Sequence, residues 1–206
     1  TAVWSTQFFL AGLPMFWVVL LVAVSLGGAA GAYLIFPHVQ SRVDRFLNPD
    51  SGDTYQVEKA LQAFRNGGIF GRGPGEGRVK EQLPDSHTDF IFAVIGEELG
   101  LFGTLITLFL LAVLLFSIFK LALRVHDPMV RYVTAGFGCW IAIQTVLNVG
   151  SAISVLPVVG VTLPLVSYGG SALVATYMGI GFVLGAARRD PVIYKELQET
   201  GIKWLR

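Results

Sequence analysis

The sequence is poor in charge and in cysteine. Asp, Glu, Lys and Arg together make up only 14% of its 206 residues, whereas soluble domains carry about 25%. The single cysteine, Cys139, lies inside an apolar run, which excludes an internal disulfide and any metal site built from cysteines. The net charge of +1 gives no electrostatic basis for a nucleic-acid partner. A soluble domain is therefore a poor match to this composition.

Long uncharged runs are abundant instead. Three of them, at residues 14–36, 99–119 and 132–187, contain 23, 21 and 56 residues. Because about 20 helical residues cross the hydrocarbon core of a bilayer, the longest run holds two spans. A membrane β-barrel would instead require short strands in which apolar and polar residues alternate, and these long uncharged runs do not have that pattern. We predict an all-α, polytopic membrane protein whose full transmembrane helices cover residues 14–36, 99–123, 132–155 and 171–187.

The first twelve residues, TAVWSTQFFLAG, are also uncharged, but they are too few to span a membrane. No basic region precedes them and no A-x-A cleavage site follows, so they do not fit a signal peptide. We predict that residues 1–12 are the tail of a truncated helix and that the chain is a fragment.

Residues 38–88 form a polar loop of 51 residues. Structureless loops of this length are uncommon and are usually functional. Within the loop, Val57, Leu61 and Phe64 follow helical spacing, which predicts a helix over residues 56–65 that lies on the membrane surface or against the bundle. The glycines of NGGIFGRGPGEGR then exclude regular structure over residues 66–78.

The glycine-rich part of this loop also carries positive charge. Arg72, Arg78 and Lys80 are interleaved with glycines that include Gly73 and Gly75. Exposed backbone N–H groups beside cations form a cradle for anions, although a plain flexible loop has the same composition. The spacing matches neither a dinucleotide fingerprint nor a P-loop. An acid close to such a cradle would suit chemistry on a phosphorylated lipid.

The charges also predict the orientation of the chain. Residues 120–131 carry three basic residues and one acid, and the tail at 188–206 carries five and three. An even number of spans separates these two segments, so they share a side, and their basic excess favours the cytoplasm. We therefore predict a cytoplasmic tail at 188–206 and a large extracytoplasmic loop at 38–88.

The stretch LPDSHTDFIFAVIGEELG, residues 83–100, permits two interpretations. Ser86 and Asp89 fit a capping box at the start of a helix. Against a purely structural role, Asp85 and Asp89 would repel each other on one helix face. Glu97 and Glu98 follow at the start of a span, where ionisable groups are usually functional, and we expect them to pair with a basic group or to cap a cavity. The residues alone leave both interpretations open.

A second segment, residues 156–170, is apolar but interrupted by prolines and glycines. Irregular backbone at membrane depth is either covered by protein or faces a watery cavity. We therefore expect residues 157–170 to line such a space.

Two motifs resemble the FtsW/RodA/SpoVE family. Residues 71–103, GRGPGEGRVKEQLPDSHTDFIFAVIGEELGLFG, are similar to its large extracytoplasmic loop, and residues 156–172, LPVVGVTLPLVSYGGSA, are similar to its second signature. The resemblance covers essentially the whole chain. It implies that residues 1–206 are the carboxyl-terminal part of one integral membrane domain of ten helices. LPDSHTDF is closest to the division-type FtsW branch, but Val158-Val159-Gly160 stands where that branch often has Thr-Lys-Gly, so a basic residue is missing.

The resemblance implies a peptidoglycan glycosyltransferase that polymerises lipid II into glycan strands during cell division. Its essential acid corresponds to Asp89, the expected general base. The candidate substrate-binding residues are Arg72, Gly73, Gly75, Arg78, Lys80, His87, Ser167, Gly169 and Gly170. The metal-binding residues are unknown, and a divalent cation, Mg or Mn, is implied by the resemblance alone.

The resemblance also implies where the protein works and with which partners. The expected location is the cytoplasmic (inner) membrane, with the large loop on the periplasmic or outer side. The expected partners are lipid II, a class B penicillin-binding transpeptidase and other divisome membrane proteins. The alternatives are a lipid II flippase and a non-catalytic divisome scaffold.

Overall fold

The computed structural model describes residues 2–10, 12, 14–47, 55–83, 85–188 and 190. Its helices are α1 (Ala2–Leu10), α2 (Met15–Ile35), α3 (Pro37–Leu47), α4 (Tyr55–Gly67), the 3-10 helix η2 (Val79–Glu81), α5 (Ile91–Arg124), α6 (Pro128–Ala152) and α7 (Gly170–Arg188). None of the described residues belongs to a strand. Four helices, α2, α5, α6 and α7, are long and apolar enough to cross a membrane. The prediction of an all-α polytopic membrane protein is confirmed.

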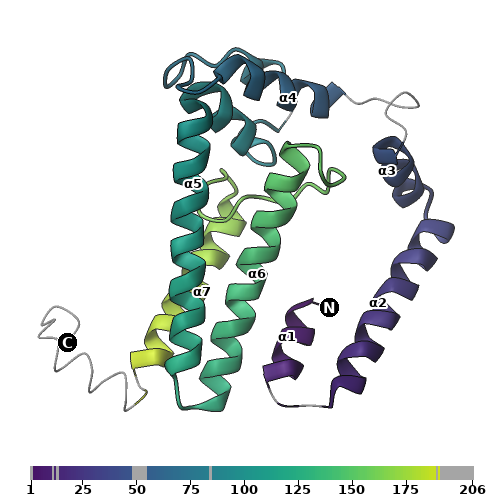
Figure 1. Ribbon diagram of the computed structural model, residues 1–206, viewed down its shortest axis with the longest axis vertical. Coiled ribbons are helices and arrows are strands. Elements are labelled where there is room, and N and C mark those ends of the chain that lie inside the picture. Colours follow the sequence, from purple (N-terminus) through teal and green to yellow (C-terminus); the bar gives the residue numbers. More distant parts are fainter. Residues whose placement is uncertain are drawn as a thin grey trace, which may run out of the picture.

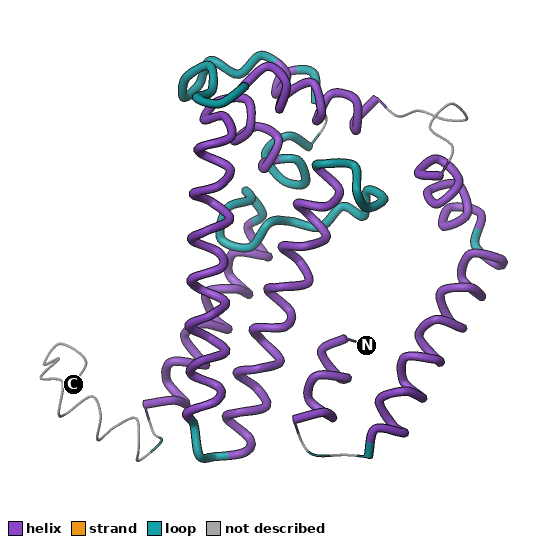
Figure 2. Tube along the Cα trace, in the orientation of Figure 1, coloured by secondary structure: helices purple, strands orange, loops and turns teal. Residues whose placement is uncertain are grey.

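The helices α5, α6 and α7 pack into a bundle, and α1 lies against α6 (Figure 1). Small residues allow close contact between the helices: a Cβ atom at Gly138 would lie 3.0 Å from the side chain of Ile118, and one at Gly179 would overlap the ring of Phe137. Membrane helices use such residues to bring their backbones together. Figure 2 shows the longer loops in the half of the bundle that carries α4, and we call that end of the bundle the loop end.

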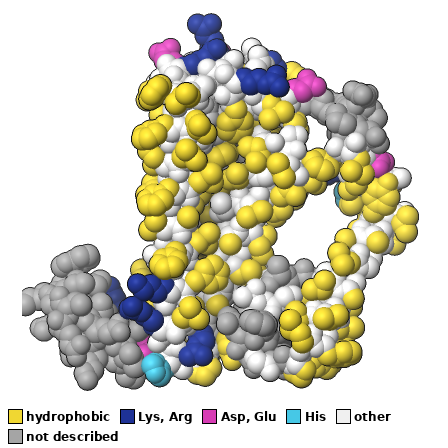
Figure 3. All heavy atoms as spheres, in the orientation of Figure 1, with side chains coloured by type: hydrophobic (Ala, Val, Ile, Leu, Met, Phe, Trp, Pro, Cys, Tyr) yellow, Lys and Arg dark blue, Asp and Glu magenta, His cyan; other side chains and the backbone are white. Residues whose placement is uncertain are grey.

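Helix α2 stands outside this bundle. It has no buried residue, and it packs against α1 and α3. Figure 3 shows hydrophobic side chains along α2 and α5, with charged side chains gathered near the two ends of the molecule. This distribution is the one expected where the flanks of the helices face lipid and their ends face water.

Helix α3 was not foreseen from the sequence. Pro37 ends α2, as expected, but it also begins α3, because a proline is well suited to the first position of a helix. Val39, Val43, Phe46 and Leu47 repeat at helical spacing on an otherwise polar segment, which is the signal that could have revealed the helix. The predicted loop at 38–88 therefore starts with an amphipathic helix.

Helix α4 confirms the helix predicted within residues 56–65 and lies across the loop end of α5 (Figure 1). Its buried face consists of Ala60, Ala63 and Gly67. A Cβ atom at Gly67 would overlap the carbonyl of Gly96, and one at Gly96 would overlap the ring of Phe64. The absence of side chains at these two glycines lets α4 approach the α5 backbone directly.

Helix α5 is interrupted near its loop end. Its 34 residues would extend about 51 Å, well beyond the roughly 30 Å hydrocarbon core. Gly100 breaks the helix with φ +68° and ψ −165°, a conformation that favours glycine. The N–H groups of Leu101 and Phe102 donate to the carbonyls of Gly68 and Ile69 at 2.9 and 3.2 Å. The break separates a span beginning at Leu101 from a shorter segment beneath the glycine-rich loop.

The remaining helix boundaries follow local sequence signals. α6 begins at Pro128, before the predicted Tyr132, because Asp127 caps it and Pro128 occupies its first turn. It ends at Ala152 rather than Val155. The predicted tail at 188–206 lies outside the described residues, except for Arg188 and Asp190.

Candidate active site

Asp89 lies in a tight turn, residues 85–90, directly before α5. The carbonyl of Asp85 accepts the N–H groups of residues 88, 89 and 90 at 3.1, 3.0 and 3.3 Å. Asp85 has a left-handed φ of +55°, which Asp and Asn tolerate better than most residues. The N-cap of α5 is Phe90, without a side-chain hydrogen bond. The capping-box interpretation of Ser86 and Asp89 is therefore wrong, because the Asp85 carbonyl closes this turn and also accepts the hydroxyl of Thr88 at 3.2 Å.

The second motif and Asn148 on α6 hold the backbone of this turn in place. Three consecutive carbonyls of the turn each accept a hydrogen bond: His87 from the N–H of Tyr168 at 2.9 Å, Thr88 from Oγ of Ser167 at 2.6 Å, and Asp89 from Nδ2 of Asn148 at 2.8 Å. Two motifs that are far apart in the sequence thus form one rigid unit around Asp89.

Of the three predicted residues of the second motif, Ser167 contacts this turn directly, through its hydrogen bond to the carbonyl of Thr88. Ser167 is buried, and its Oγ also accepts the N–H of Leu163 at 2.7 Å. Gly169 lies close to Thr162, since a Cβ atom at Gly169 would be 3.2 Å from its Cγ2. Gly170 begins α7. The Ser167 hydroxyl thus holds the turn in place, while the side chain of His87 is exposed.

The carboxyl group of Asp89 faces Gly160. A Cβ atom at Gly160, whose φ is +73°, would lie 3.3 Å from Oδ2 of Asp89. Within the described ranges, this carboxyl group has no hydrogen-bond or ion-pair partner. Burial raises the pKa of Asp89, and the negative charge of Asp85 raises it further. A raised pKa on an unpaired acid is typical of a group that takes up a proton.

Sequence reasoning missed two residues around Asp89. Gly160 was predicted only as part of the segment 157–170 and not as a neighbour of Asp89, and Asn148 was hidden within an apolar run. An isolated asparagine in a membrane-length segment is itself a signal of function. Nη1 of Arg42 on α3 also lies 3.5 Å from the carbonyl oxygen of Val158, so a cation does reach this segment.

The glycine-rich loop is folded onto Glu97 and Glu98. Glu97 is completely buried, and it accepts hydrogen bonds from Nδ2 of Asn66 at 3.3 Å and from the N–H of Val79 at 3.0 Å. Nη1 of Arg72 lies 3.7 Å from its Oε1. The expectation that these acids pair with basic groups is confirmed.

Glu98 occupies the predicted anion cradle. Its carboxylate accepts Nζ of Lys80 at 2.7 Å and the N–H of Gly75 at 2.9 Å, while the N–H of Gly73 donates to its backbone carbonyl at 3.0 Å. The hydrogen bond to Glu98 raises the pKa of Lys80. Arg78 is exposed and has no ion-pair or hydrogen-bond partner in the described part of the chain. The predicted binding residues therefore fall into two groups, one around the Asp89 turn and one around Glu98.

Glu97→Gln is expected to loosen the glycine-rich loop. The glutamine amide group would direct its N–H donors at Asn66 or at the Val79 N–H, and a mismatched buried group costs about 1–3 kcal/mol. Limited trypsin digestion should therefore cleave the variant faster after Arg72 and Arg78, as measured by mass spectrometry of the full-length protein. Glu76→Gln, an exposed acid in the same loop, is the control. Equal cleavage of the two variants would contradict the role given to Glu97.

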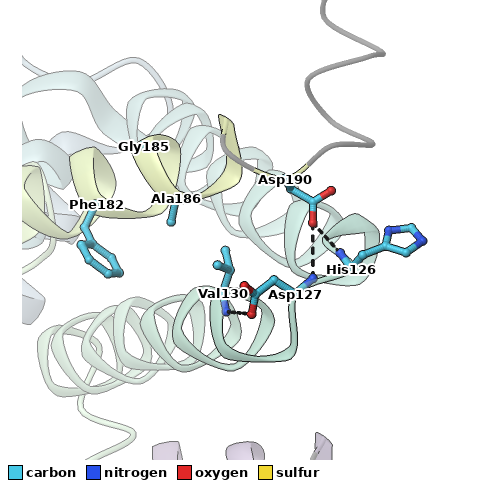
Figure 4. Close-up of a pocket in the computed structure, with 7 residues that line it drawn as sticks. All are labelled: His126, Asp127, Val130, Phe182, Gly185, Ala186 and Asp190. Atoms are coloured by element: carbon cyan, nitrogen blue, oxygen red, sulfur yellow. Dashed lines mark hydrogen bonds between the residues drawn. The ribbon is translucent and has the colours of Figure 1, made fainter.

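A cavity at the other end of the bundle is less suited to chemistry. It has a volume of about 510 Å³ and is lined by His126, Asp127, Val130, Phe182, Gly185, Ala186 and Asp190 (Figure 4). Oδ2 of Asp190 accepts the N–H groups of His126 and Asp127 at 2.7 and 3.3 Å, and Asp127 caps α6. The His126 ring points away from the cavity (Figure 4). These carboxylates stabilise helix ends, so the Asp89 turn is the better candidate.

Comparison with known proteins gives consistent matches. The sequence model of the FtsW/RodA/SpoVE family, described as cell cycle proteins, matches residues 2–191 of this chain. A probable peptidoglycan glycosyltransferase FtsW of Caulobacter vibrioides is 39% identical over 203 residues, which cover 98% of this chain and 52% of that protein. Stage V sporulation protein E of Bacillus subtilis is 39% identical over 87% of this chain and 50% of its own length. The chain spans about half the length of these relatives.

Solved structures resemble the fold as well. A peptidoglycan synthase complex, described as coordinating polymerization and crosslinking, contains a chain with a TM-score of 0.69 and 33% identity, over 90% of this chain and 53% of that one. A mutant of the rod shape determining protein RodA of Thermus thermophilus has a TM-score of 0.51 and 39% identity, over 64% of this chain and 40% of that one. This chain belongs to the FtsW/RodA/SpoVE family of cell cycle proteins.

Proposed function

We propose that this chain is part of a peptidoglycan glycosyltransferase that polymerises lipid II during cell division, with Asp89 as general base. The relatives named as FtsW glycosyltransferases support the reaction class. The observation that carries the role of Asp89 is its unpaired carboxyl group beside Gly160, with a pKa raised by burial and by Asp85. The direct test is polymerisation of lipid II by the full-length protein with its transpeptidase partner. The absence of glycan product would overturn the proposal.

The proposed step joins two sugars. A sugar 4-hydroxyl attacks an anomeric carbon, the bond from that carbon to the diphosphate oxygen breaks, and the lipid diphosphate leaves with the electron pair. Asp89 removes the proton of the attacking hydroxyl. General-base catalysis of this kind contributes about 10²–10⁴-fold. The raised pKa suits the task, because a carboxylate that is too acidic is a poor base.

The leaving diphosphate needs positive charge. Arg78 is exposed and has no ion-pair partner in the described part of the chain, whereas Arg72 and Lys80 already contact Glu97 and Glu98. We propose that Arg78 contacts the diphosphate directly, and that Arg72 and Lys80 contribute mainly by shaping the loop that carries Gly73 and Gly75. His87 remains a further candidate because its exposed side chain lies in the Asp89 turn.

A divalent cation is part of the proposal, but the described residues do not form a metal site of their own. No group of three or more His, Cys, Asp or Glu side chains in the described ranges is placed to hold an ion. Magnesium is often bound largely through substrate phosphates. If Mg or Mn takes part, the substrate diphosphate would hold it rather than these residues, and it would offset the negative charge of the leaving group.

The location and partners are proposed on the same basis. The excess of basic residues at 120–131 and 188–206 supports a cytoplasmic location for that end of the bundle and an extracytoplasmic loop end. Lipid II and a class B penicillin-binding transpeptidase would meet Asp89 at the loop end. The resemblance to a chain within a peptidoglycan synthase complex supports such a partner.

Asp85→Asn is expected to extend activity to lower pH. Asp89 acts as a base only when ionised, so turnover falls as the pH drops through its pKa, and the charge of Asp85 raises that pKa. Removing this charge lowers the pKa of Asp89 and moves the acid limb of the pH–rate profile to lower pH. Asparagine also accepts the left-handed backbone of residue 85.

The control for this measurement is Glu81→Gln, which removes an exposed acid elsewhere in the loop. Its acid limb should coincide with that of the parent. An Asp85→Asn profile that is unchanged, or that moves to higher pH, would contradict the assignment of the limb to Asp89.

A further inference from the structure

Asn148 connects the Asp89 turn to the second motif. It lies on α6 and is only 2% exposed. Its Nδ2 atom donates to the carbonyl oxygen of Asp89 at 2.8 Å and to that of Val161 at 2.7 Å. One amide group thus uses both of its hydrogens to join two backbone segments that are distant in the sequence.

The orientation of this amide is fixed by its partners. Both contacts are carbonyl oxygens, which only accept, so the NH₂ side must face them. Oδ1 points elsewhere and has no partner among the described protein groups. An aspartate of the same shape could not make both bonds, because a carboxyl group carries at most one proton.

The two backbone atoms that Asn148 holds are those on which the geometry of the site depends. One belongs to Asp89 itself, and the other to Val161, directly after the Gly160 that faces the Asp89 carboxyl group. The remaining anchors of the turn, Ser167 and the N–H of Tyr168, hold the carbonyls of Thr88 and His87. Asn148 therefore fixes the acid and the wall opposite it at the same time.

We infer that Asn148 is a positioning residue for Asp89, one that holds the carboxyl group and the Gly160 backbone at the separation needed for proton removal. This inference rests on the proposed glycosyltransferase function. Its physical basis is that a displacement of about 1 Å in a catalytic group can cost roughly 10²-fold in rate. Lipid II binding depends on other groups, so the effect should fall on kcat.

The test compares Asn148→Ala and Asn148→Asp with the parent, as full-length protein in complex with its transpeptidase and polymerising lipid II. We expect kcat to fall about 100-fold in both variants, with KM within about threefold of the parent. The control is Thr145→Val, which lies one turn earlier on α6 and whose hydroxyl donates to the carbonyl of Ile141 within the same helix at 2.9 Å. The control should retain the kcat of the parent.

Activity is normalised to the amount of monodisperse, folded complex, so that each outcome either supports or overturns the inference. A kcat near that of the parent in either variant, a rise in KM with an unchanged kcat, or an equal loss in Thr145→Val would overturn the inference. If neither variant can be recovered folded, Asn148 is a purely structural residue and the inference fails. A parent complex that makes no glycan would instead reject the proposed function, which separates the two failures.

Discussion

Asp89→Asn is expected to abolish lipid II polymerisation, with turnover falling by about 10²–10⁴-fold. Asparagine matches the shape of aspartate but cannot remove a proton from a sugar hydroxyl. The fold should be retained, because the turn around residue 89 is closed by the carbonyl of Asp85 and held by three backbone carbonyls rather than by the Asp89 side chain. The loss of activity should therefore not be accompanied by a loss of stability.

The measurement is glycan formation by the full-length protein with its transpeptidase partner. Asp85→Asn is the matched control, because it makes the same substitution in the same turn and removes the charge of a neighbouring acid instead of the base. It should polymerise lipid II near neutral pH. Comparable loss in both variants would indicate that negative charge in the turn, and not the base, is what matters.

Asp89→Asn, together with replacement of Arg78, also separates the alternative functions. A flippase would move lipid II across the membrane without forming glycan, and translocation would persist in Asp89→Asn. A scaffold would tolerate replacement of Asp89 and Arg78 alike. If glycan forms at the rate of the parent in Asp89→Asn, the general-base mechanism is rejected whichever alternative holds.

The transmembrane helices were predictable because their hydrophobicity adds up residue by residue along the chain. An uncharged run as long as residues 14–36 fits a membrane-crossing helix whatever surrounds it. Helix α2 illustrates this, because it has no buried residue along its whole length. The amphipathic helix α3 was not predicted although its apolar residues follow helical spacing, because Pro37 ends α2 and the segment after it is mostly polar. The break at Gly100 could not be predicted, since it depends on a turn from the glycine-rich loop that packs against it.

The site was only partly predictable, for a similar reason. Asp89 and the basic residues of the loop could be identified as candidates, but their partners come from elsewhere in the chain. Glu98 pairs with Lys80 as expected, but in doing so it occupies the cradle that was assigned to a substrate anion. The capping box failed because the backbone carbonyl of Asp85 accepts the N–H of Asp89, which the Ser86 side chain was expected to bind. Sequence patterns indicate which groups need partners, whereas packing decides which partners they receive.

The proximity of Glu98 to the loop gives the glycines a specific role. Gly73 and Gly75 present N–H groups to Glu98, and Gly71 allows the backbone to pass directly over the end of the first α5 segment. The glycine-rich motif therefore serves close contact with α5 as well as any contact with the substrate. If so, steric change at Gly71 should unfold the loop even though this residue carries no chemistry.

Gly71→Ala is expected to be strongly destabilising. Gly71 has a φ of +81°, and a Cβ atom there would overlap the backbone carbonyl of Glu98. The left-handed backbone costs a non-glycine residue about 1–2 kcal/mol, and overpacking against a rigid group costs about 1–3 kcal/mol more. The variant should show faster proteolysis of the loop, a lower midpoint of thermal unfolding for the full-length protein, and reduced polymerisation.

Gly68→Ala separates these two costs. Gly68 also has a left-handed φ, +55°, but a Cβ atom there would meet nothing within 4 Å. This variant should therefore lose only the backbone contribution of about 1–2 kcal/mol, and its loop should resist protease better than that of Gly71→Ala. If the two variants lose equal stability, the contact between Gly71 and Glu98 does not hold the loop. The loop would then owe its order to its other contacts, such as the Lys80–Glu98 pair and the hydrogen bonds to the buried Glu97.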